Sequence, residues 1–428
     1  MKKENYKPMI KGVIISVLSL MLLITLPFIS SLISERENFQ SEVTTEVTSK
    51  WGQKQTIYGP FVLVEYYTNH LTEDGKVMKQ LNSYLQTPIK QDFTGDIKTQ
   101  IKKRSLYEVA LYNTNLNVKA SFPTLDELAS KLNLADKEAF TNAKIVFSVS
   151  DSKGFTQEIL INKNPQQYFE QDRSLRINSR IAFLSYDINK EDIDLSNINF
   201  PIQLKGSTEI NFLATAKQTN VNVSSDYKDI KYIGNYLPDN DEKQSVNEQS
   251  KWTIFQSIPV SSDLNTIPQL TDYSFGMKFI QINDFYSKVN RATKYALLFI
   301  GLTFATFFFM ENIKNLSINI LHYTLVGLAL CINFVLLLSF AEYTGFSIAY
   351  IISASATIIL ITSFIYGLSK NKRIAATIFG LLFALYTFLF FLLQLKEAAL
   401  IVGSIGLFTI IAILMYFSKR ITFSTEEE

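Results

Sequence analysis

Two apolar runs decide the fold, namely residues 318–340, INILHYTLVGLALCINFVLLLSF, and residues 346–368, FSIAYIISASATIILITSFIYGL. Five residues separate the runs, and neither holds a charged side chain when histidine is counted as neutral. An α-helix needs about 20 apolar residues to cross the hydrocarbon core of a membrane. The runs therefore predict two membrane-spanning helices joined by a short turn.

The apolar composition extends over the whole C-terminal part of the chain. Residues 295–418 carry eight charged side chains, where the chain-wide fraction of 19% predicts about 24. Further apolar segments lie at residues 292–310, 374–395 and 398–417, and a separate one lies near the N-terminus at 13–33. The sequence therefore predicts six transmembrane helices, one N-terminal and five C-terminal.

Two interpretations fit the N-terminal run. Lysines precede it, and Ser30, Ser31 and Ser34 form a weak cleavage signal, as in a secretory signal peptide. Its length of about 20 residues and the lack of an Ala-x-Ala site favour an uncleaved anchor. Pro27 is expected to kink the last third of this helix.

The distribution of basic residues predicts the orientation. With six spans, the N-terminus, alternate loops and the C-terminal end carry ten Lys and Arg residues, whereas the two short loops on the other side carry one, Lys396. Cytoplasmic segments of membrane proteins hold the excess of Lys and Arg. Both termini are therefore expected in the cytoplasm, and the long insert between the first two spans on the far side.

The insert at residues 35–290 has the composition of a water-soluble domain. Runs rich in β-branched and aromatic residues predict seven strands, at 56–67, 105–116, 143–149, 180–186, 209–214, 252–260 and 275–282. Thr124, with Glu127 three residues later, predicts a capped helix at 124–132. The insert is thus predicted to be a mainly antiparallel β domain with one or two sandwich-like lobes.

Residues that serve most catalytic and metal sites are scarce. Cys331 is the single cysteine, which excludes an intramolecular disulfide and a cysteine cluster for zinc or iron–sulfur. His70 and His322 are too few for a multi-histidine metal site, and neither lies in a nucleophile motif. The net charge of +2 implies no basic stripe for nucleic acid. We expect no catalytic residue, no cofactor and no metal.

Charged side chains near the predicted spans are candidate functional or coupling residues. Ionisable groups at membrane depth are costly and often functional. Glu311 and Glu342 are either boundary residues at span ends or members of an interhelical salt bridge or ion path. Arg291 and Lys294 either extend toward lipid headgroups or couple the insert to the bundle. In the second case their expected partners are Glu342 and Glu397.

Two further features carry expectations. Arg104 belongs to a basic cluster at 102–104 before a predicted strand. It either contacts anionic headgroups or glycan, or is an ordinary solvated surface residue. Asn333 lies within a predicted span and is expected to form a hydrogen bond with a neighbouring helix. Small side chains at every fourth residue predict a close-packing face, at Gly345, Ala349, Ser353 and Thr357.

A series of residues, in order and at suitable spacing, carries a family resemblance. The second span holds Tyr286, Arg291-Ala292, Lys294-Tyr295-Ala296, Leu298-Phe299, Leu302-Thr303-Phe304, Phe308-Phe309 and Glu311. The insert holds Trp51-Gly52, Gln55, Gly59-Pro60, Arg104, Tyr107-Glu108, Tyr112, Asp151, Gly154 and Lys205-Gly206-Ser207. Over nearly its whole length the chain resembles the CreD inner-membrane proteins, also called cell envelope integrity proteins.

The resemblance implies the inner membrane of a bacterium with two membranes, and hence a periplasmic insert. It also implies an association with envelope integrity and with a stress response under a two-component regulator. The chain departs from the family where residues 319–323 read Asn-Ile-Leu-His-Tyr and where Lys396-Glu397 replaces Glu-Asp. These departures fit an architectural role better than a catalytic one.

The predicted fold class is therefore an α+β membrane protein in four parts. These are a cytoplasmic N-terminus with the first transmembrane helix at 1–34, a periplasmic β-rich domain at 35–290, a five-helix transmembrane bundle at 291–418 and a cytoplasmic acidic tail at 419–428. The leading functional hypothesis is a non-enzymatic protein that supports or senses envelope integrity. Its expected partners are membrane lipid and a periplasmic protein or cell-wall component. A transporter or permease component, or an enzyme acting on lipid or cell-wall material, is the alternative.

Overall fold

The chain forms two compact units. The computed structural model describes residues 7–71, 77–164, 166–177, 181–188, 193–239, 248–255, 272–280, 285–314, 318–395 and 399–418. The helical unit comprises Met1–Ser41 and Asn283–Glu428, and the β unit comprises Glu42–Ile282. Apolar helices in one unit and β-sheets in the other give an α+β membrane protein, as predicted at that level. The predicted tail at 419–428 lies outside the described residues.

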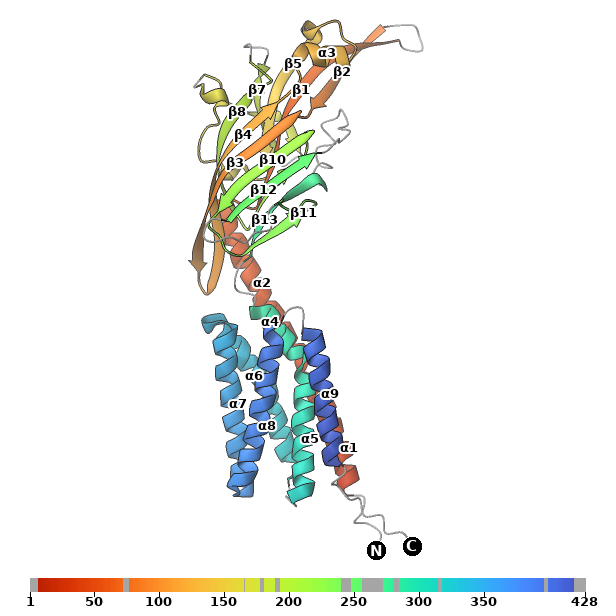
Figure 1. Cartoon of the computed structure of the whole chain (residues 1–428), viewed down its shortest axis with the longest axis vertical. Coiled ribbons are helices and arrows are strands. Elements are labelled where there is room, and N and C mark those ends of the chain that lie inside the picture. The colour runs from red at the N-terminus through yellow and green to blue at the C-terminus, as the bar shows by residue number, and fades with distance from the viewer. Residues whose placement is uncertain are drawn as a thin grey trace. The chain divides into compact units, whose positions relative to one another are not determined.

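The helical unit is built from long apolar helices (Figure 1). Its helices are α1 Lys7–Leu23, the first part of α2 Thr25–Trp51, α4 Phe285–Lys294, α5 Ala296–Lys314, α6 Ile320–Thr344, α7 Phe346–Ser369, α8 Lys372–Gln394 and α9 Ala399–Ser418. Within the described residues, four helical runs are long and apolar enough to span a membrane, or five if the bent pair α4–α5 is one span. This count of four or five does not confirm the six spans that the sequence predicts.

The first span has a break close to the kink that Pro27 predicts, and its helix extends further than predicted. Helix α1 ends at Leu23 and α2 begins at Thr25, so the break precedes Pro27 by about one turn. A proline ring clashes with the carbonyl four residues earlier, which here belongs to Leu23. The helix also continues to Trp51, well beyond the apolar run, and Phe39, Val43, Val47 and Trp51 give this extension an apolar stripe at helical spacing.

Thirteen strands in the described residues form two sheets of the β unit. They are β1 Gln55–Leu71, β2 Val77–Gln86, β3 Lys90–Arg104, β4 Tyr107–Ser121, β5 Phe140–Val149, β6 Glu170–Ile177, β7 Ile181–Asp187, β8 Ile198–Ser207, β9 Glu209–Leu213, β10 Gln218–Ser225, β11 Ile230–Gly234, β12 Glu248–Phe255 and β13 Ser274–Phe279. One sheet has the order β11-β13-β9-β1-β5-β7-β6 with β2 on β1, and the other has the order β12-β10-β3-β4-β8. Two of the described pairs, β1–β9 and β10–β3, are parallel and the others are antiparallel.

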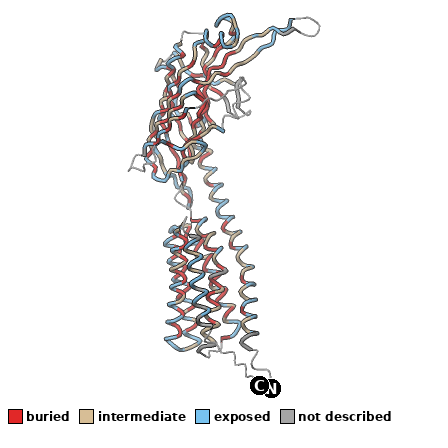
Figure 2. Tube along the Cα trace, turned by 45° about the vertical axis from the view of Figure 1, so that its right-hand side comes forward, coloured by how far each residue is buried: buried red, intermediate tan, exposed pale blue. Residues whose placement is uncertain are grey.

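The sheets pack face to face around one main core, as in a sandwich. Buried side chains of both sheets belong to one contiguous cluster, including Val62 and Phe147 of the first sheet and Phe93 and Phe200 of the second. The rings of Phe147 and Phe200 meet edge to face with centroids 5.3 Å apart. Buried and exposed positions alternate along β4, β8 and β10 of the five-stranded sheet, whereas β1 is buried on both faces at residues 57–64 (Figure 2). A second, smaller apolar cluster, which includes Phe61, Val146 and Phe183, lies on the other face of the first sheet.

All seven predicted strands coincide with strands, although residue 180 and residues 256–260 and 281–282 lie outside the described part. Six strands were not predicted: β2, β3, β6, β8, β10 and β11. The predicted capped helix is α3, Leu125–Lys131. The Glu127 amide donates to Thr124 Oγ1 at 3.2 Å and the Thr124 amide donates to Glu127 Oε2 at 2.8 Å, which confirms the capping box.

A buried glutamine joins three segments of the β unit. Gln55 has no exposed surface, and its Nε2 donates to the carbonyls of Asp151 and Lys205, each at 3.0 Å. Its Oε1 accepts from the Asp151 amide at 3.2 Å. The segments approach so closely that a Cβ at Gly154 would lie 2.4 Å from the Lys205 carbonyl oxygen. The side chain of Gln55 therefore satisfies backbone groups that have little room for water.

Gln55→Leu is expected to destabilise the β unit by about 3 kcal/mol, because it removes three hydrogen bonds to backbone groups, although the Asp151 carbonyl still accepts from the Gly154 amide. The matched control is Gln53→Leu, since the side chain of Gln53 is exposed and only its backbone is bonded. Denaturant unfolding monitored by β-sheet circular dichroism measures both. Equal midpoints for the two variants would show that the Gln55 bonds do not stabilise the fold.

Candidate functional site

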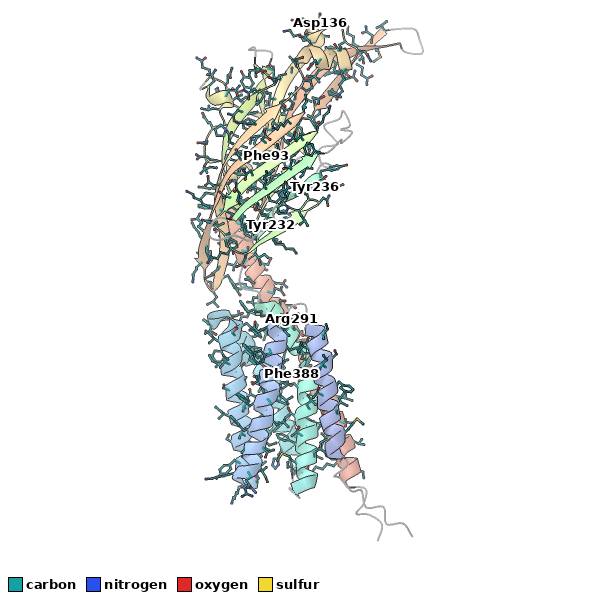
Figure 3. All side chains as sticks on the ribbon, viewed as in Figure 1. Phe93, Asp136, Tyr232, Tyr236, Arg291 and Phe388 are labelled. Carbon is teal, nitrogen blue, oxygen red and sulfur yellow. The ribbon has the colours of Figure 1, made fainter. Side chains whose placement is uncertain are left out.

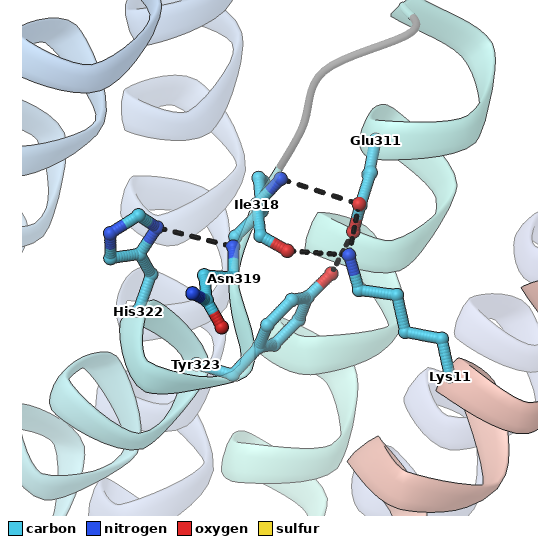
Figure 4. Close-up of polar contacts among 6 residues, drawn as sticks. All are labelled: Lys11, Glu311, Ile318, Asn319, His322 and Tyr323. Atoms are coloured by element: carbon cyan, nitrogen blue, oxygen red, sulfur yellow. Dashed lines mark hydrogen bonds and ion pairs between the residues drawn. The ribbon is translucent and has the colours of Figure 1, made fainter.

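A cluster of charged and polar side chains joins three helices of the helical unit (Figure 4). We call it the Lys11 cluster; it comprises Lys11 of α1, Glu311 of α5, Tyr323 of α6 and Ile318, which precedes α6. Lys11 Nζ donates to Glu311 Oε1 and to the carbonyl of Ile318. Tyr323 donates its hydroxyl to Glu311 Oε2 at 3.0 Å, and the Ile318 amide donates to Glu311 Oε1 at 3.3 Å.

Both carboxylate oxygens of Glu311 are therefore engaged. The Glu311 side chain is 11% exposed and the Lys11 side chain 26% exposed, so water screens this pair incompletely. Of the two predicted roles for Glu311, the structure places it in an interhelical salt bridge. Lys11 was not predicted as its partner, because the sequence indicates only that the residue precedes an apolar run.

A second group, the Glu342 cluster, comprises Glu342 of α6, Tyr286 of α4 and Arg36 of α2. Tyr286 donates its hydroxyl to Glu342 Oε1 at 3.0 Å, and Arg36 Nε lies 3.8 Å from the same oxygen. The Glu342 side chain is 8% exposed, whereas that of Arg36 is 47% exposed. The expected pairing of Glu342 with Arg291 is thus replaced by a pairing with Arg36.

The two clusters hold the first helical run at two separated positions. Lys11 and Arg36 are 25 residues apart, which corresponds to about 37 Å along a straight helix. This length exceeds the hydrocarbon core of about 30 Å and is less than the full bilayer of roughly 40–45 Å. The spacing suits one cluster at each membrane interface, where side chains can reach both apolar and hydrated surroundings.

Arg291 binds the C-terminal end of α8 instead of a carboxylate (Figure 3). Its Nη1 donates to the carbonyl of Leu395 at 3.2 Å and its Nη2 to that of Leu393 at 3.0 Å. The last carbonyls of a helix lack partners within the helix and carry partial negative charge. Arg291 therefore satisfies the end of α8 and attaches α4 to it.

The remaining candidates have different surroundings. Lys294 ends α4, is exposed and makes no ion pair with the residues that the structure describes. Glu397 lies outside the described residues, so its expected pairing is not placed.

The predicted contact of Asn333 is confirmed, since Thr357 Oγ1 of α7 donates to Asn333 Oδ1 of α6 at 3.1 Å. Ala349, Ser353 and Thr357 of the predicted small-residue face are buried.

Arg104 belongs to the β unit and is the last residue of β3, where the basic cluster was expected before a strand. Its guanidinium lies 3.5 Å from Glu46 and its side chain is 63% exposed. Nearby, the ring of Trp51 lies between two ammonium groups, with Lys102 Nζ 4.8 Å and Lys205 Nζ 4.5 Å from its centroid. These cation–π contacts fix the end of α2 to strands β3 and β8.

Apolar helices with paired charges, together with a two-sheet unit, define a multi-pass membrane protein. The family described as CreD, Inner membrane protein CreD, matches residues 7–424, and the chain belongs to this family. The chain is similar to the inner membrane protein CreD of Escherichia coli strain K12, with 25% identity over an alignment of 428 positions. The alignment covers 94% of this chain and 90% of the relative. The protein is therefore an inner-membrane protein with several apolar helices.

Breaking the Lys11–Glu311 pair is expected to destabilise the helical unit. Glu311→Gln leaves the ammonium of Lys11 without its counter-ion and should cost about 2 kcal/mol, between the values for exposed and buried pairs. Lys11→Met combined with Glu311→Gln should cost less than the sum of the single variants, because no unpaired charge remains. Unfolding of the purified protein in sodium dodecyl sulfate measures each, and Lys372→Met, at an exposed residue, is the control. Additive effects would contradict the coupling.

Charge reversal distinguishes the two possible partners of Glu342. Arg36→Glu should lower the amount of folded protein in membranes, because it places two carboxylates near Tyr286, and Glu342→Lys should restore it. Arg291→Glu should not be restored by Glu342→Lys, because Arg291 binds carbonyls of α8. The measurement is resistance of the membrane-embedded protein to trypsin. If Glu342→Lys restored Arg291→Glu but not Arg36→Glu, the pairing of Glu342 with Arg36 would be wrong.

Proposed function

We propose that this protein supports or senses the integrity of the cell envelope without catalysing a reaction or using a cofactor. In this proposal six helices span the inner membrane: the α1–α2 run, α4–α5 as one bent span, α6, α7, α8 and α9. The N-terminus and the C-terminus lie in the cytoplasm, and the β unit lies in the periplasm. Membership of the family supports the location in the inner membrane. The number of spans, their orientation and the role in the envelope belong to the proposal.

One observation carries the proposal. The helical run that leads into the β unit is bound to the bundle at two positions, by the Lys11 cluster and by the Glu342 cluster. A helix held in this way resists sliding and tilting relative to its neighbours. It is therefore suited to transmit a load or displacement from the β unit to the bundle, which an envelope-supporting or envelope-sensing protein requires.

The charge distribution supports the orientation. Lysines and arginines are concentrated at the N-terminus and around the α7–α8 connection, at Lys370, Lys372 and Arg373, and Lys314 ends α5. Such segments remain on the cytoplasmic side. The Lys11 cluster would then lie at the cytoplasmic interface and the Glu342 cluster at the periplasmic interface. The β unit follows α2 on the periplasmic side in this arrangement.

A transporter or permease component is the second candidate. It is favoured by the polar contact between Asn333 and Thr357 in the interior of two apolar helices, because polar side chains at membrane depth can mark a substrate path. The same contact is sufficient to stabilise helix packing.

Cysteine labelling tests the proposed orientation. In a Cys331→Ser background, Asp136→Cys in the β unit should react with a membrane-impermeant maleimide in spheroplasts, because Asp136 is exposed. Asn371→Cys, in the exposed α7–α8 connection, should react only after lysis. The reverse pattern would place the β unit in the cytoplasm and overturn the proposal.

Complementation tests the functional part. A strain lacking the protein should survive poorly in bile salt or detergent, and the wild-type chain should restore survival. Arg36→Glu should restore it less well, and the pair Arg36→Glu with Glu342→Lys should do better. Full survival without the protein would contradict a role in envelope integrity.

A further inference from the structure

The five-stranded sheet has one face in the core and one face directed outward. On β4, Leu116 and Val118 are buried, whereas the alternate residues Asn113 and Asn115 are exposed and Asn117 is half-buried. The strand pairing places the outward residues of β3, β8, β10 and β12 on the same side as those of β4. Figure 1 shows these strands as one sheet. The outward face therefore extends across all five strands.

Carboxamide side chains are concentrated on this face. Asn115 lies opposite Gln203 of β8, and Asn117 lies opposite Thr94 of β3, which in turn lies opposite Asn222 of β10. We call this surface the amide face; its carboxamides are Asn113, Asn115, Asn117, Gln203, Asn220 and Asn222. With a strand spacing of about 4.8 Å, these residues cover roughly 15–20 Å across the sheet.

Folding does not explain this choice of residues. Asparagine is depleted in strands, where threonine, valine and aromatic residues are favoured. Three asparagines at alternate positions of one strand therefore act against the local structure, although threonine would solvate the face equally well. A local rule that is broken without a gain in packing is most often found where a surface has a function.

The centre of the face retains unused hydrogen-bonding capacity. At its margin, Asn220 donates to Asp92 and Gln249 donates to Asn222 Oδ1 at 2.8 Å. The side chains of Asn113, Asn115 and Asn117 make no hydrogen bond with the residues that the structure describes. Each carboxamide offers two donors and one acceptor oxygen. This combination matches hydroxyl groups, which both donate and accept.

Positive charge flanks the same centre. Lys98 of β3 and Lys205 of β8 lie opposite Asn113 on its two sides, so their backbones are about 10 Å apart. Within the described part of the chain, neither lysine forms a salt bridge. A carboxylate above Asn113 would be attracted by the Lys98 ammonium. Asp96, opposite Asn115, carries a negative charge on the same face, and the Lys205 ammonium also contacts the Trp51 ring. The face thus complements a ligand that carries many hydroxyls and some carboxylates.

We propose that the amide face binds peptidoglycan, whose glycan strands carry the hydroxyl groups and whose stem peptides carry the carboxylates. The proposal rests on the proposed function, which places the β unit in the compartment that contains this polymer. A protein partner would require apolar anchors near the centre of the interface. The large exposed hydrophobic residue of this outward face, Phe255, is instead at the end of the edge strand β12.

Co-sedimentation of the detergent-solubilised full chain with purified peptidoglycan sacculi tests the proposal. The wild type should bind, and Asn113→Thr, Asn115→Thr and Asn117→Thr together should weaken binding by about ten-fold or more. Threonine is favoured in strands, so this variant should remain folded, and its unfolding midpoint verifies this. Lys98→Glu should also weaken binding, because Lys98 forms no ion pair with the described residues. The control, Lys79→Glu with Gln80→Thr on exposed positions of β2, should bind as the wild type does.

Three results would overturn the proposal: no binding of the wild type, unchanged binding of the triple variant, or a triple variant that loses binding to anionic phospholipid vesicles while keeping its binding to sacculi. The last result would identify a lipid site. The labelling of Asp136→Cys separates this proposal from the proposed function. Labelling from outside together with absent sacculus binding would remove only the glycan partner, whereas labelling from inside would remove both.

Discussion

A carboxylate near the apolar interior of a membrane is stable only when it is paired, because the low dielectric constant there strongly penalises an isolated charge. Glu311 and Glu342 each meet this requirement with a basic residue from the first helical run and with a tyrosine hydroxyl. The pairing selects one arrangement of α1, α2, α4, α5 and α6 from the many that apolar packing alone would allow. The rest of the helical unit depends on this arrangement, since α7 and α8 then pack on α6 and α4 through small side chains and the Arg291 contacts.

The β unit solves a related problem with a neutral side chain. Gln55 satisfies backbone groups of two distant segments where the chain is too crowded for water, and Tyr112 donates its hydroxyl to the Glu209 carbonyl at 2.9 Å. Burial raises the pKa of Tyr112 well above its usual value, so its hydroxyl remains a donor. These residues belong to the series that carries the family resemblance. Their proximity shows that the resemblance includes a structural junction of the β unit.

Hydropathy predicted the helices well because the membrane imposes a length and a composition that a single segment must satisfy. Residues 346–368 were expected to form a span, and α7 is Phe346–Ser369. The partners of charged residues were not predictable in the same way. Arg291, Lys11 and Arg36 all lie near span ends, and only the packing of the helices decides which of them meets Glu342. The extension of α2 to Trp51 had a signal that the prediction did not use, because Phe39, Val43, Val47 and Trp51 recur at every fourth residue.

The strands that the sequence did not predict identify the amide face as unusual. Of the five strands in the second sheet, β3, β8 and β10 were missed, and each alternates buried apolar residues with polar ones that strands usually avoid. In β10, for example, Val221 and Val223 enter the core while Asn220 and Asn222 occupy the outward face. The pattern of two-residue alternation is present, but the residue types on one side oppose the strand assignment. A sheet that keeps such residues, although threonine or lysine would fold more readily, indicates selection for contact with something polar, and this is the physical reason to seek the partner of the β unit on that face.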